Sequence, residues 1–261
     1  MDNKIVAVIV GLVVMVAFLG GRATSNLQLV RKEPASVTIQ PKQVTQAQPQ
    51  ANQPAVLGAS DAKDLADGGI AVKGNQDAKV TIVEVSDPSC PYCGAADGGN
   101  QQVINSLKSK DPTYVPAIPA IVKDYVETGK VKLVYRYYPG HGTGEKTMQA
   151  LYCAVDSGKF WDFLDKVFQN QAALSNLDAN FDSVLNLADE VGLDKNAISD
   201  CVTNGKYQTQ IQKDQTDVQT AIQKLQLPGF GTPAFFVNGQ YVGGAVSYPN
   251  IKQVIDQELA K

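Results

Sequence analysis

The sequence predicts an α/β fold for the C-terminal domain of the chain, which we place at residues 61–261. One observation is a pair of β-branched runs of strand length, at residues 80–85 and 131–137. A second is the series of amphipathic segments that follows, in which apolar residues recur with the 3.6-residue period of a helix. A third is a hairpin pattern near the C-terminus, where Asn238-Gly239 separates two short apolar runs.

The composition of the chain suits such a fold and excludes other classes. Of its 261 residues, 44% are hydrophobic, which is enough for a packed core. Lys and Arg total 23 against 26 Asp and Glu, and this balance argues against a nucleic-acid-binding protein. The single histidine, His141, lies between glycines and is interpreted as a loop residue rather than as part of a His-rich metal site or a Ser-His hydrolase.

The N-terminal segment has the features of a membrane anchor. Residues 5–21 carry no charge, and a run of seventeen is about the lower limit for a membrane-spanning helix. A cleavable signal peptide has a similar apolar run, but the best cleavage site, residues 21–23, contains Arg22. We therefore favour an uncleaved transmembrane anchor over residues 1–22, with a removed signal as the alternative, and expect the C-terminal bulk outside the cytoplasm.

A linker is expected between this anchor and the domain, over residues 23–60. Six of the fourteen residues 40–53 are Gln, and prolines are interspersed. The stretch shows neither a helical nor a strand period and offers too little apolar surface to offset the entropy of ordering. We interpret it as a disordered tether.

Within the domain, the elements follow in a simple order. The run at residues 80–85 is followed at once by the turn residues 87–89, and residues 131–137 form the second strand. Helices are then expected at residues 145–156, 160–169, 181–191, 196–202 and 207–225. Hairpin strands at residues 234–237 and 240–243, joined by a type I′ turn, precede a final helix at residues 248–259.

The sharpest chemical feature is Cys90-Pro91-Tyr92-Cys93, which follows the first strand and opens an expected helix. Unpaired amides and the positive end of the helix dipole stabilise a thiolate at a helix N-terminus. Pro91 suits the first helical position, where no N–H is needed. We therefore expect Cys90 to be the exposed nucleophile and Cys93, one turn further in, to resolve the mixed disulfide.

A C-x-x-C pair also forms half of many zinc sites, and this alternative has to be weighed. Completing such a site needs two more ligands. Cys153 and Cys201 are isolated in the sequence rather than forming a second C-x-x-C, which disfavours zinc. We expect neither a metal nor another cofactor.

Two further positions bear on redox chemistry, and for each the residues alone leave two alternatives open. Thr232-Pro233 precedes the hairpin, and its peptide bond is either a cis bond that turns the backbone toward a neighbouring site or an ordinary trans bond. Glu84 lies six residues before Cys90 in an apolar strand. It is either a buried acid that exchanges a proton with Cys93 or a strand residue that faces solvent.

Together the segments VTIVEVSDPSCPYC, VKLVYRYYP and GFGTPAFFVNGQYVGGA resemble the DsbA-like thiol:disulfide oxidoreductases over roughly residues 70–261. The resemblance implies a thioredoxin fold with an inserted helical block. It implies that Cys90 attacks, that Cys93 resolves, and that Glu84 is a buried acid beneath them. The site is completed by four residues: Pro233 as a cis-proline facing the pair, Thr232 presenting backbone to substrate, and Pro91 with Tyr92 as part of the substrate-binding surface.

The resemblance also bears on the remaining cysteines and on two departures from the family pattern. Some relatives have a structural disulfide in the inserted block, which implies a Cys153–Cys201 bridge; two unrelated buried thiols are the alternative. Glycines 94, 98 and 99 follow the redox motif where the family usually has bulky residues, so we expect a short or broken helix there. The stretch at residues 108–119 is longer than usual and is expected near the site.

The function that follows is an extracytoplasmic thiol:disulfide oxidoreductase that forms disulfide bonds in exported proteins with free thiols. The resemblance implies a membrane quinone-linked partner that reoxidises the reduced pair. A membrane-tethered reductase or isomerase is one alternative, since Pro91-Tyr92 does not decide the direction of electron flow. A non-catalytic thioredoxin-like module that binds peptides or metal is the other.

Overall fold

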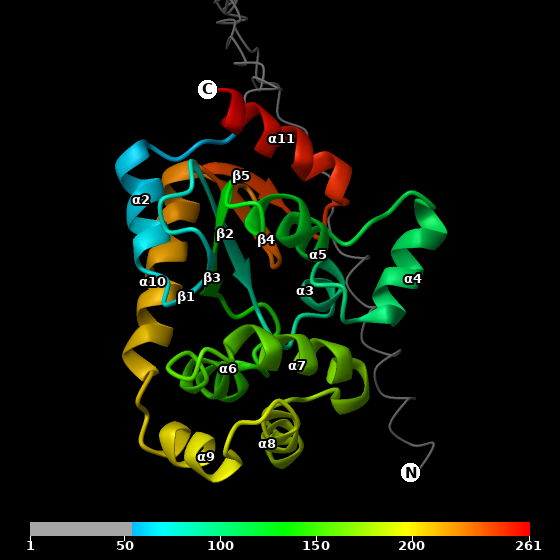
Figure 1. Cartoon of the computed structure of the whole chain (residues 1–261), viewed down its shortest axis with the longest axis vertical. Helices are drawn as coiled ribbons and strands as arrows, with labels where there is room; N and C mark the ends of the chain where they lie inside the picture. The colour runs from blue at the N-terminus through cyan, green and yellow to red at the C-terminus, as the bar shows by residue number, and fades with distance from the viewer. Residues whose placement is uncertain (1–53) are drawn as a thin grey trace, which may run out of the picture. The chain divides into compact units, whose positions relative to one another are not determined.

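The computed structural model describes residues 54–261, which form a five-stranded mixed sheet with helices on both faces (Figure 1). The expected anchor at residues 1–22 and most of the expected linker lie outside the described residues. None of the helices in the described part of the chain has both the length and the apolar character that a membrane-spanning segment needs.

The sheet has the strand order β1-β3-β2-β4-β5. Its central strands β2 and β3 are parallel, and every other neighbouring pair is antiparallel. The strands are β1 (Ala71–Gly74), β2 (Val80–Ser86), β3 (Val131–Tyr137), β4 (Ala234–Val237) and β5 (Gln240–Gly243). The two central strands and the hairpin lie where the sequence predicts them, whereas the edge strand β1 was not expected.

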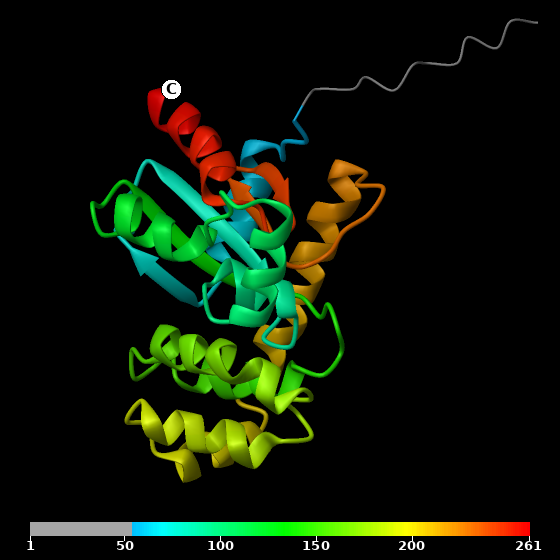
Figure 2. The same cartoon turned by 90° about the vertical axis from the view of Figure 1, so that its right-hand side faces the viewer.

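Alternation along the strands divides the core into two layers. Ile82 and Leu133 belong to the layer covered by α5 (Ala117–Ile121) and α11 (Tyr248–Ala260). Val83, Val134 and Phe236 face the opposite side, which α2 (Ala59–Asp67) and α10 (Gln208–Leu225) cover. Strands buried on both faces read as continuous apolar runs, which is why residues 80–85 and 131–137 were recognisable. Figure 2 shows the two helical layers from the side.

An inserted helical block connects β3 to β4, and the expected α/β fold with such an insertion is confirmed. Its helices are α6 (Glu145–Cys153), α7 (Phe160–Leu174), α8 (Phe181–Glu190), α9 (Lys195–Thr203) and α10. Figures 1 and 2 show α6 and α7 next to one end of the sheet and α8 and α9 farther from it. Tyr135 and Tyr137 at the end of β3 belong to the apolar cluster of this block, so the sheet and the insertion share a core.

Several segments differ from expectation. α2 begins at Ala59, and the N–H of buried Leu57 donates to the Gly239 carbonyl, so the folded domain begins a few residues before residue 61. Between the redox motif and β3 lie α4 (Gln101–Lys110), α5 and the π-helical turn η2 (Val122–Val126), none of which was expected. α6 ends at Cys153 rather than at residue 156, and α7 continues five residues past residue 169.

Candidate active site

Cys90 lies at the end of the turn that connects β2 to the next helix. After β2 ends at Ser86, a turn follows in which the Cys90 N–H donates to the Asp87 carbonyl (3.0 Å). Cys90 is the residue before α3 (Pro91–Ala96), with Pro91 at its first position. The helix is only six residues long, in agreement with the expectation of a short helix. The turn thus places the sulfur at a helix N-terminus, next to amides that have no partner within the helix.

The expectation that Cys90 is exposed is wrong, because its exposed fraction is only 1%. Its Sγ lies 3.2 Å from the Thr232 carbonyl oxygen, to which it donates when protonated, so the loop before β4 lies against the sulfur. Hydrogen bonding from Cys93 and from the amides of Cys93 and Tyr92 lowers the pKa of Cys90 from 9.0 to about 6, although burial opposes this. The site therefore holds an ionised thiol with little contact to water.

Cys93 has the opposite electrostatics. It is fully buried one turn into α3, and burial, followed by its hydrogen bond to Cys90, raises its pKa well above the usual range. The two sulfurs therefore share one proton, which stays on the buried sulfur while the outer one ionises. This asymmetry is what an attacking and a resolving cysteine require.

The loop opposite the two cysteines comes from the other end of the domain. The Thr232–Pro233 peptide bond is cis, so the trans alternative is wrong. The Gly244 N–H donates to the Pro233 carbonyl (2.8 Å). β4 begins at the next residue, and Ala234 pairs with Val85 of β2. The pairing of β2 with β4 therefore brings Pro233 beside the cysteine pair across more than 140 residues of sequence.

Glu84 is fully buried, so the solvent-facing alternative for this residue is wrong. It lies in the middle of the sheet, paired with Tyr135 on one side and Phe235 on the other. Both carboxyl oxygens lack a hydrogen bond of normal geometry. Burial raises the pKa of Glu84 from 4.5 to about 7, and the nearby Ser86 hydroxyl offsets this only in part. A carboxyl in this state can hold a proton at neutral pH and release it readily.

A second acidic residue, missed at the sequence level, lies at the end of α3. Burial and the neighbouring carboxyls of Glu84 and Asp165 raise the pKa of Asp97 well above its usual range. Asp97 and Asp165 line a cavity of about 200 Å³ together with Lys73 and Trp161. These residues come from α3, α7 and β1, and no local spacing pattern connects them.

Asp87 organises the loops around the pair. Its buried carboxylate accepts hydrogen bonds from the amides of Ser89 (2.7 Å), Gly140 (2.7 Å) and His141 (3.0 Å). It thus joins the turn before Cys90 to the loop after β3. The sequence marked Asp87 only as a turn residue. The exposed His141 contributes its backbone, in agreement with its interpretation as a loop residue.

A groove of about 500 Å³ lies beside Thr232, whose carbonyl oxygen contacts the Cys90 sulfur. Tyr92, which is 49% exposed, lines it together with Thr232 and Tyr241. Leu107 on α4 forms its far wall. The groove is open, and none of the residues that line it is charged.

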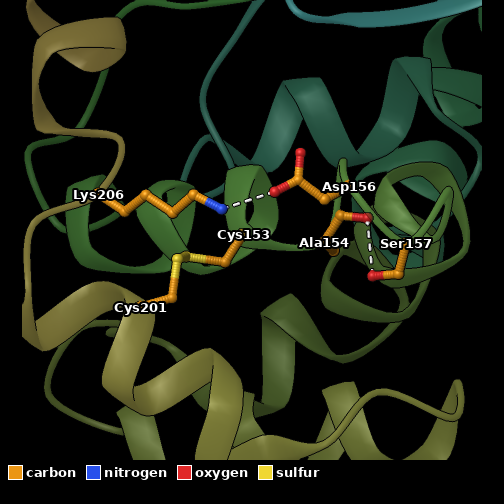
Figure 3. Close-up of a disulfide and its surroundings, with 6 residues drawn as sticks. All are labelled: Cys153, Ala154, Asp156, Ser157, Cys201 and Lys206. Atoms are coloured by element: carbon orange, nitrogen blue, oxygen red, sulfur yellow. Dashed lines mark hydrogen bonds and ion pairs between the residues drawn. A yellow bond between two sulfur atoms is a disulfide. The ribbon is translucent and has the colours of Figure 1, made fainter.

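Cys153 and Cys201 are joined in a disulfide between α6 and α9, with their Cα atoms 6.2 Å apart (Figure 3). The pairing leaves neither cysteine free as a zinc ligand. The described residues also contain no cluster of three or more side chains suited to hold a metal ion. An ion pair between Lys206 and Asp156 (2.6 Å) lies next to the bridge.

Comparison with known proteins agrees with the geometry. The thioredoxin family model matches residues 67–111 and 114–257. Disulfide bond formation protein D of Bacillus subtilis is 28% identical over 192 residues, which cover 72% of this chain and 76% of that protein. The structure of oxidised BdbD from Bacillus subtilis superposes with a TM-score of 0.60 at 24% identity, covering 75% of this chain and 95% of that one.

A third match is to part of a larger protein. The Na(+)/H(+) antiporter NhaA 1 of Salinispora arenicola is 24% identical over 192 residues, or 72% of this chain. The alignment spans only 24% of that antiporter. The same kind of domain thus occurs there as one segment of a longer chain.

Proposed function

The chain belongs to the thioredoxin family as a DsbA-like thiol:disulfide oxidoreductase, and from this premise we propose that Cys90 and Cys93 form its redox pair. We further propose that it acts outside the cytoplasm, where it forms disulfide bonds in exported proteins. The name of the Bacillus subtilis relative, disulfide bond formation protein D, supports the direction. The apolar run at residues 5–21 supports an anchored protein with its domain beyond the membrane.

In the proposed cycle, a substrate thiolate attacks the Cys90 sulfur of the Cys90–Cys93 disulfide. The S–S bond between the two cysteines breaks, a bond between the substrate and Cys90 forms, and Cys93 leaves with the electron pair. Because the pKa of Cys93 lies well above the usual range, the leaving thiolate takes up a proton. Glu84, which is buried and has a raised pKa, is the proposed donor of this proton. A second substrate thiolate then attacks the bound substrate sulfur and releases the Cys90 thiolate.

The pKa of Cys90, lowered to about 6, is the observation that carries this direction. Stabilising the thiolate stabilises the reduced pair, which makes the corresponding disulfide a better oxidant. The same property makes Cys90 a good leaving group in the last step. The reduced pair then needs an oxidant, for which we propose a quinone-linked membrane partner. A tethered reductase would need a less stabilised thiolate.

Replacing Cys90 with Ser is expected to abolish oxidation of a reduced dithiol peptide, because the sulfur that forms the mixed disulfide is gone. Cys93→Ser is the matched control: it also stops turnover, but its Cys90 thiolate can still attack the disulfide of the oxidised peptide, release one peptide thiolate and stay trapped as a mixed disulfide, because no resolving cysteine remains. The measurement is loss of free thiols, with mass spectrometry to detect the mixed disulfide. Undiminished oxidation by Cys90→Ser would contradict the proposal and favour another redox site. No oxidation by the unaltered chain, with peptide binding kept in Cys90→Ser, would favour a binding module.

A further inference from the structure

A buried amide side chain links the helical insertion to the turn before Cys90. Gln171 lies on the inward face of α7 and is 5% exposed. The other buried residues of that face are Phe160, Phe163, Leu164, Val167 and Phe168. A polar group among such neighbours costs free energy unless its hydrogen bonds are made, so its partners indicate what it does.

Both the nitrogen and the oxygen of this side-chain amide form hydrogen bonds. Nε2 of Gln171 donates to the carbonyl oxygens of Pro88 (2.7 Å) and Cys90 (2.9 Å). Its Oε1 accepts a hydrogen bond from Nδ2 of Asn100 (2.9 Å). Asn100 in turn caps α4, because its side-chain oxygen accepts from the Val103 N–H (3.1 Å). Two carbonyls on one side and an amide donor on the other permit only one orientation of the Gln171 side chain.

The glycines that depart from the family pattern make room for this contact. A Cβ atom at Gly94 would lie 2.6 Å from Oε1 of Gln171. A Cβ atom at Gly99 would lie 2.8 Å from the backbone carbon of Phe168. Bulky residues at these positions would push α7 away from α3, and Gln171 would no longer reach the turn. The glycines and the amide are therefore parts of one arrangement.

The carbonyl that Gln171 holds is also the first acceptor of α3. The Cys90 carbonyl accepts from the N–H groups of Cys93 (3.0 Å) and Gly94 (3.2 Å). Its orientation fixes how the first turn of α3 lies relative to the Cys90 sulfur. Stabilisation by helix-terminal amides is confined to that first turn, so a small rotation there weakens it.

We propose that Gln171 is a positioning residue for the redox pair: its amide fixes the turn from Pro88 to Cys90 against α3, so that the inserted helices set the reactivity of the Cys90 sulfur. The proposal rests on the proposed redox function. Besides the two cysteines themselves, the titratable groups around the pair are Glu84 on β2, Tyr135 on β3 and Asp87 in the turn. Gln171 is uncharged and therefore acts through geometry.

Gln171→Met removes both donors at similar volume and tests this in the full chain with the redox pair reduced. The rate of alkylation of Cys90 by iodoacetamide is measured against pH, with unfolding curves to establish that the variant folds. We expect the pKa of Cys90 to rise by about one unit, so that the thiolate fraction at pH 5 falls about tenfold and alkylation there becomes several-fold slower. Gln169→Met, at an exposed position of the same helix, should keep the wild-type profile. A folded Gln171→Met with the wild-type profile would overturn the proposal.

A double-variant cycle tests the link to Gly94. Gly94→Ala should slow alkylation in the same direction as Gln171→Met, because the added Cβ displaces the amide. The two together should slow it no more than Gln171→Met alone, since both break one contact. Additive effects would contradict the shared arrangement.

If Gln171→Met does not fold, NMR spectroscopy of the unaltered chain tests the proposal instead. The side-chain amide resonance of Gln171 should then shift with the titration of Cys90, and that of Gln169 should not. A Gln171 side-chain amide whose chemical shift does not change as Cys90 titrates would contradict the positioning role. An ordinary thiol pKa for Cys90 in the unaltered chain would instead overturn the proposed function itself.

Discussion

The Cys90 sulfur experiences two opposing effects. Burial disfavours the thiolate, whereas hydrogen bonds from Cys93 and from the amides at the start of α3 favour it and prevail. At about 1.4 kcal/mol per pKa unit, the net preference is on the order of a few kcal/mol. Part of this preference comes from the hydrogen bond with Cys93, and burial together with the same hydrogen bond raises the pKa of Cys93. The reactivity of the pair therefore belongs to both sulfurs and cannot be divided between them.

Glu84 makes the stability of the protein depend on pH in a way that one substitution can remove. Its folded pKa, about 7, lies above the ordinary 4.5, so the stabilisation it provides is complete below pH 4.5 and is lost as the pH rises to 7. Glu84→Gln should abolish this loss. Between pH 4.5 and pH 8, the free energy of unfolding of the variant should therefore rise relative to that of the wild type by up to about 3 kcal/mol.

Urea denaturation at pH 4.5, 6 and 8 measures this difference. Glu127→Gln at an exposed position is the matched control and should follow the wild-type curve. Parallel curves for Glu84→Gln and the wild type would mean that the carboxyl is not held protonated in the folded protein.

The sequence identified the residues of the site that lie within short motifs. Cys90 and Cys93 could be predicted because a strand, a turn and a helix start are contiguous in the sequence, and the position of Pro233 opposite them followed from the family resemblance, whereas the contact of Cys90 with the Thr232 carbonyl was not foreseen. Asp97 and Gln171 could not, because their roles depend on which helices pack together. The one local signal for Gln171 is a polar residue on an otherwise apolar helical face.

At the level of elements, prediction succeeded where the hydrophobic pattern was strong. β3 and the hairpin have the expected bounds, and Asn238 (φ 45°) and Gly239 (φ 88°) have the positive φ angles that a type I′ turn needs. α4 was missed because Ile104 is its only buried residue, so its apolar stripe is too weak to detect. β1 was missed because it is a four-residue edge strand that exists through its pairing with β3.

The disulfide between α6 and α9 closes a loop of 48 residues. Removing it by Cys153→Ser with Cys201→Ser should lower the free energy of unfolding by about 4 kcal/mol, because the unfolded chain regains the entropy of the open loop. Neither helix carries a residue of the redox pair, so the alkylation rate of Cys90 should not change.

Urea denaturation of the double variant and of the wild type, each with the redox pair reduced under mild conditions, measures this effect. Mass mapping of the alkylated wild type should find Cys153 protected while Cys90 is modified. Equal stabilities, or ready alkylation of Cys153 in the folded wild type, would contradict a structural bridge.

Over the whole molecule, a buried ion-pair network attaches the insertion to the sheet. Arg136 of β3 is fully buried and pairs with Asp214 of α10 (3.0 Å) and with Asp217. Tyr152 of α6 donates to Asp214 as well. Such a network adds little net stability, but losing one partner would leave an uncompensated buried charge. It therefore favours a single arrangement of the sheet, which carries Cys90, and the insertion, which carries Gln171.

The α/β class could be inferred from the order of elements, and the inserted block from the family resemblance, but the assembly of the site could not be inferred from local patterns. Pro233 lies beside Cys90 only because β4 pairs with β2, and local patterns do not specify which strands pair. For this non-local part, the family resemblance supplied what the residues alone left open.

The central claim, that the folded chain stabilises its reduced pair enough to act as an oxidant, is tested most directly by equilibrating the full chain with glutathione buffers and quantifying the Cys90–Cys93 disulfide. Because a Cys90 pKa of about 6 lies between that of a reductant of this fold (about 7) and that of a strong oxidant (about 3.5), the account predicts a potential clearly above about −270 mV, in the direction of about −120 mV. A potential near about −270 mV, typical of a cytosolic reductant of this fold, would contradict it.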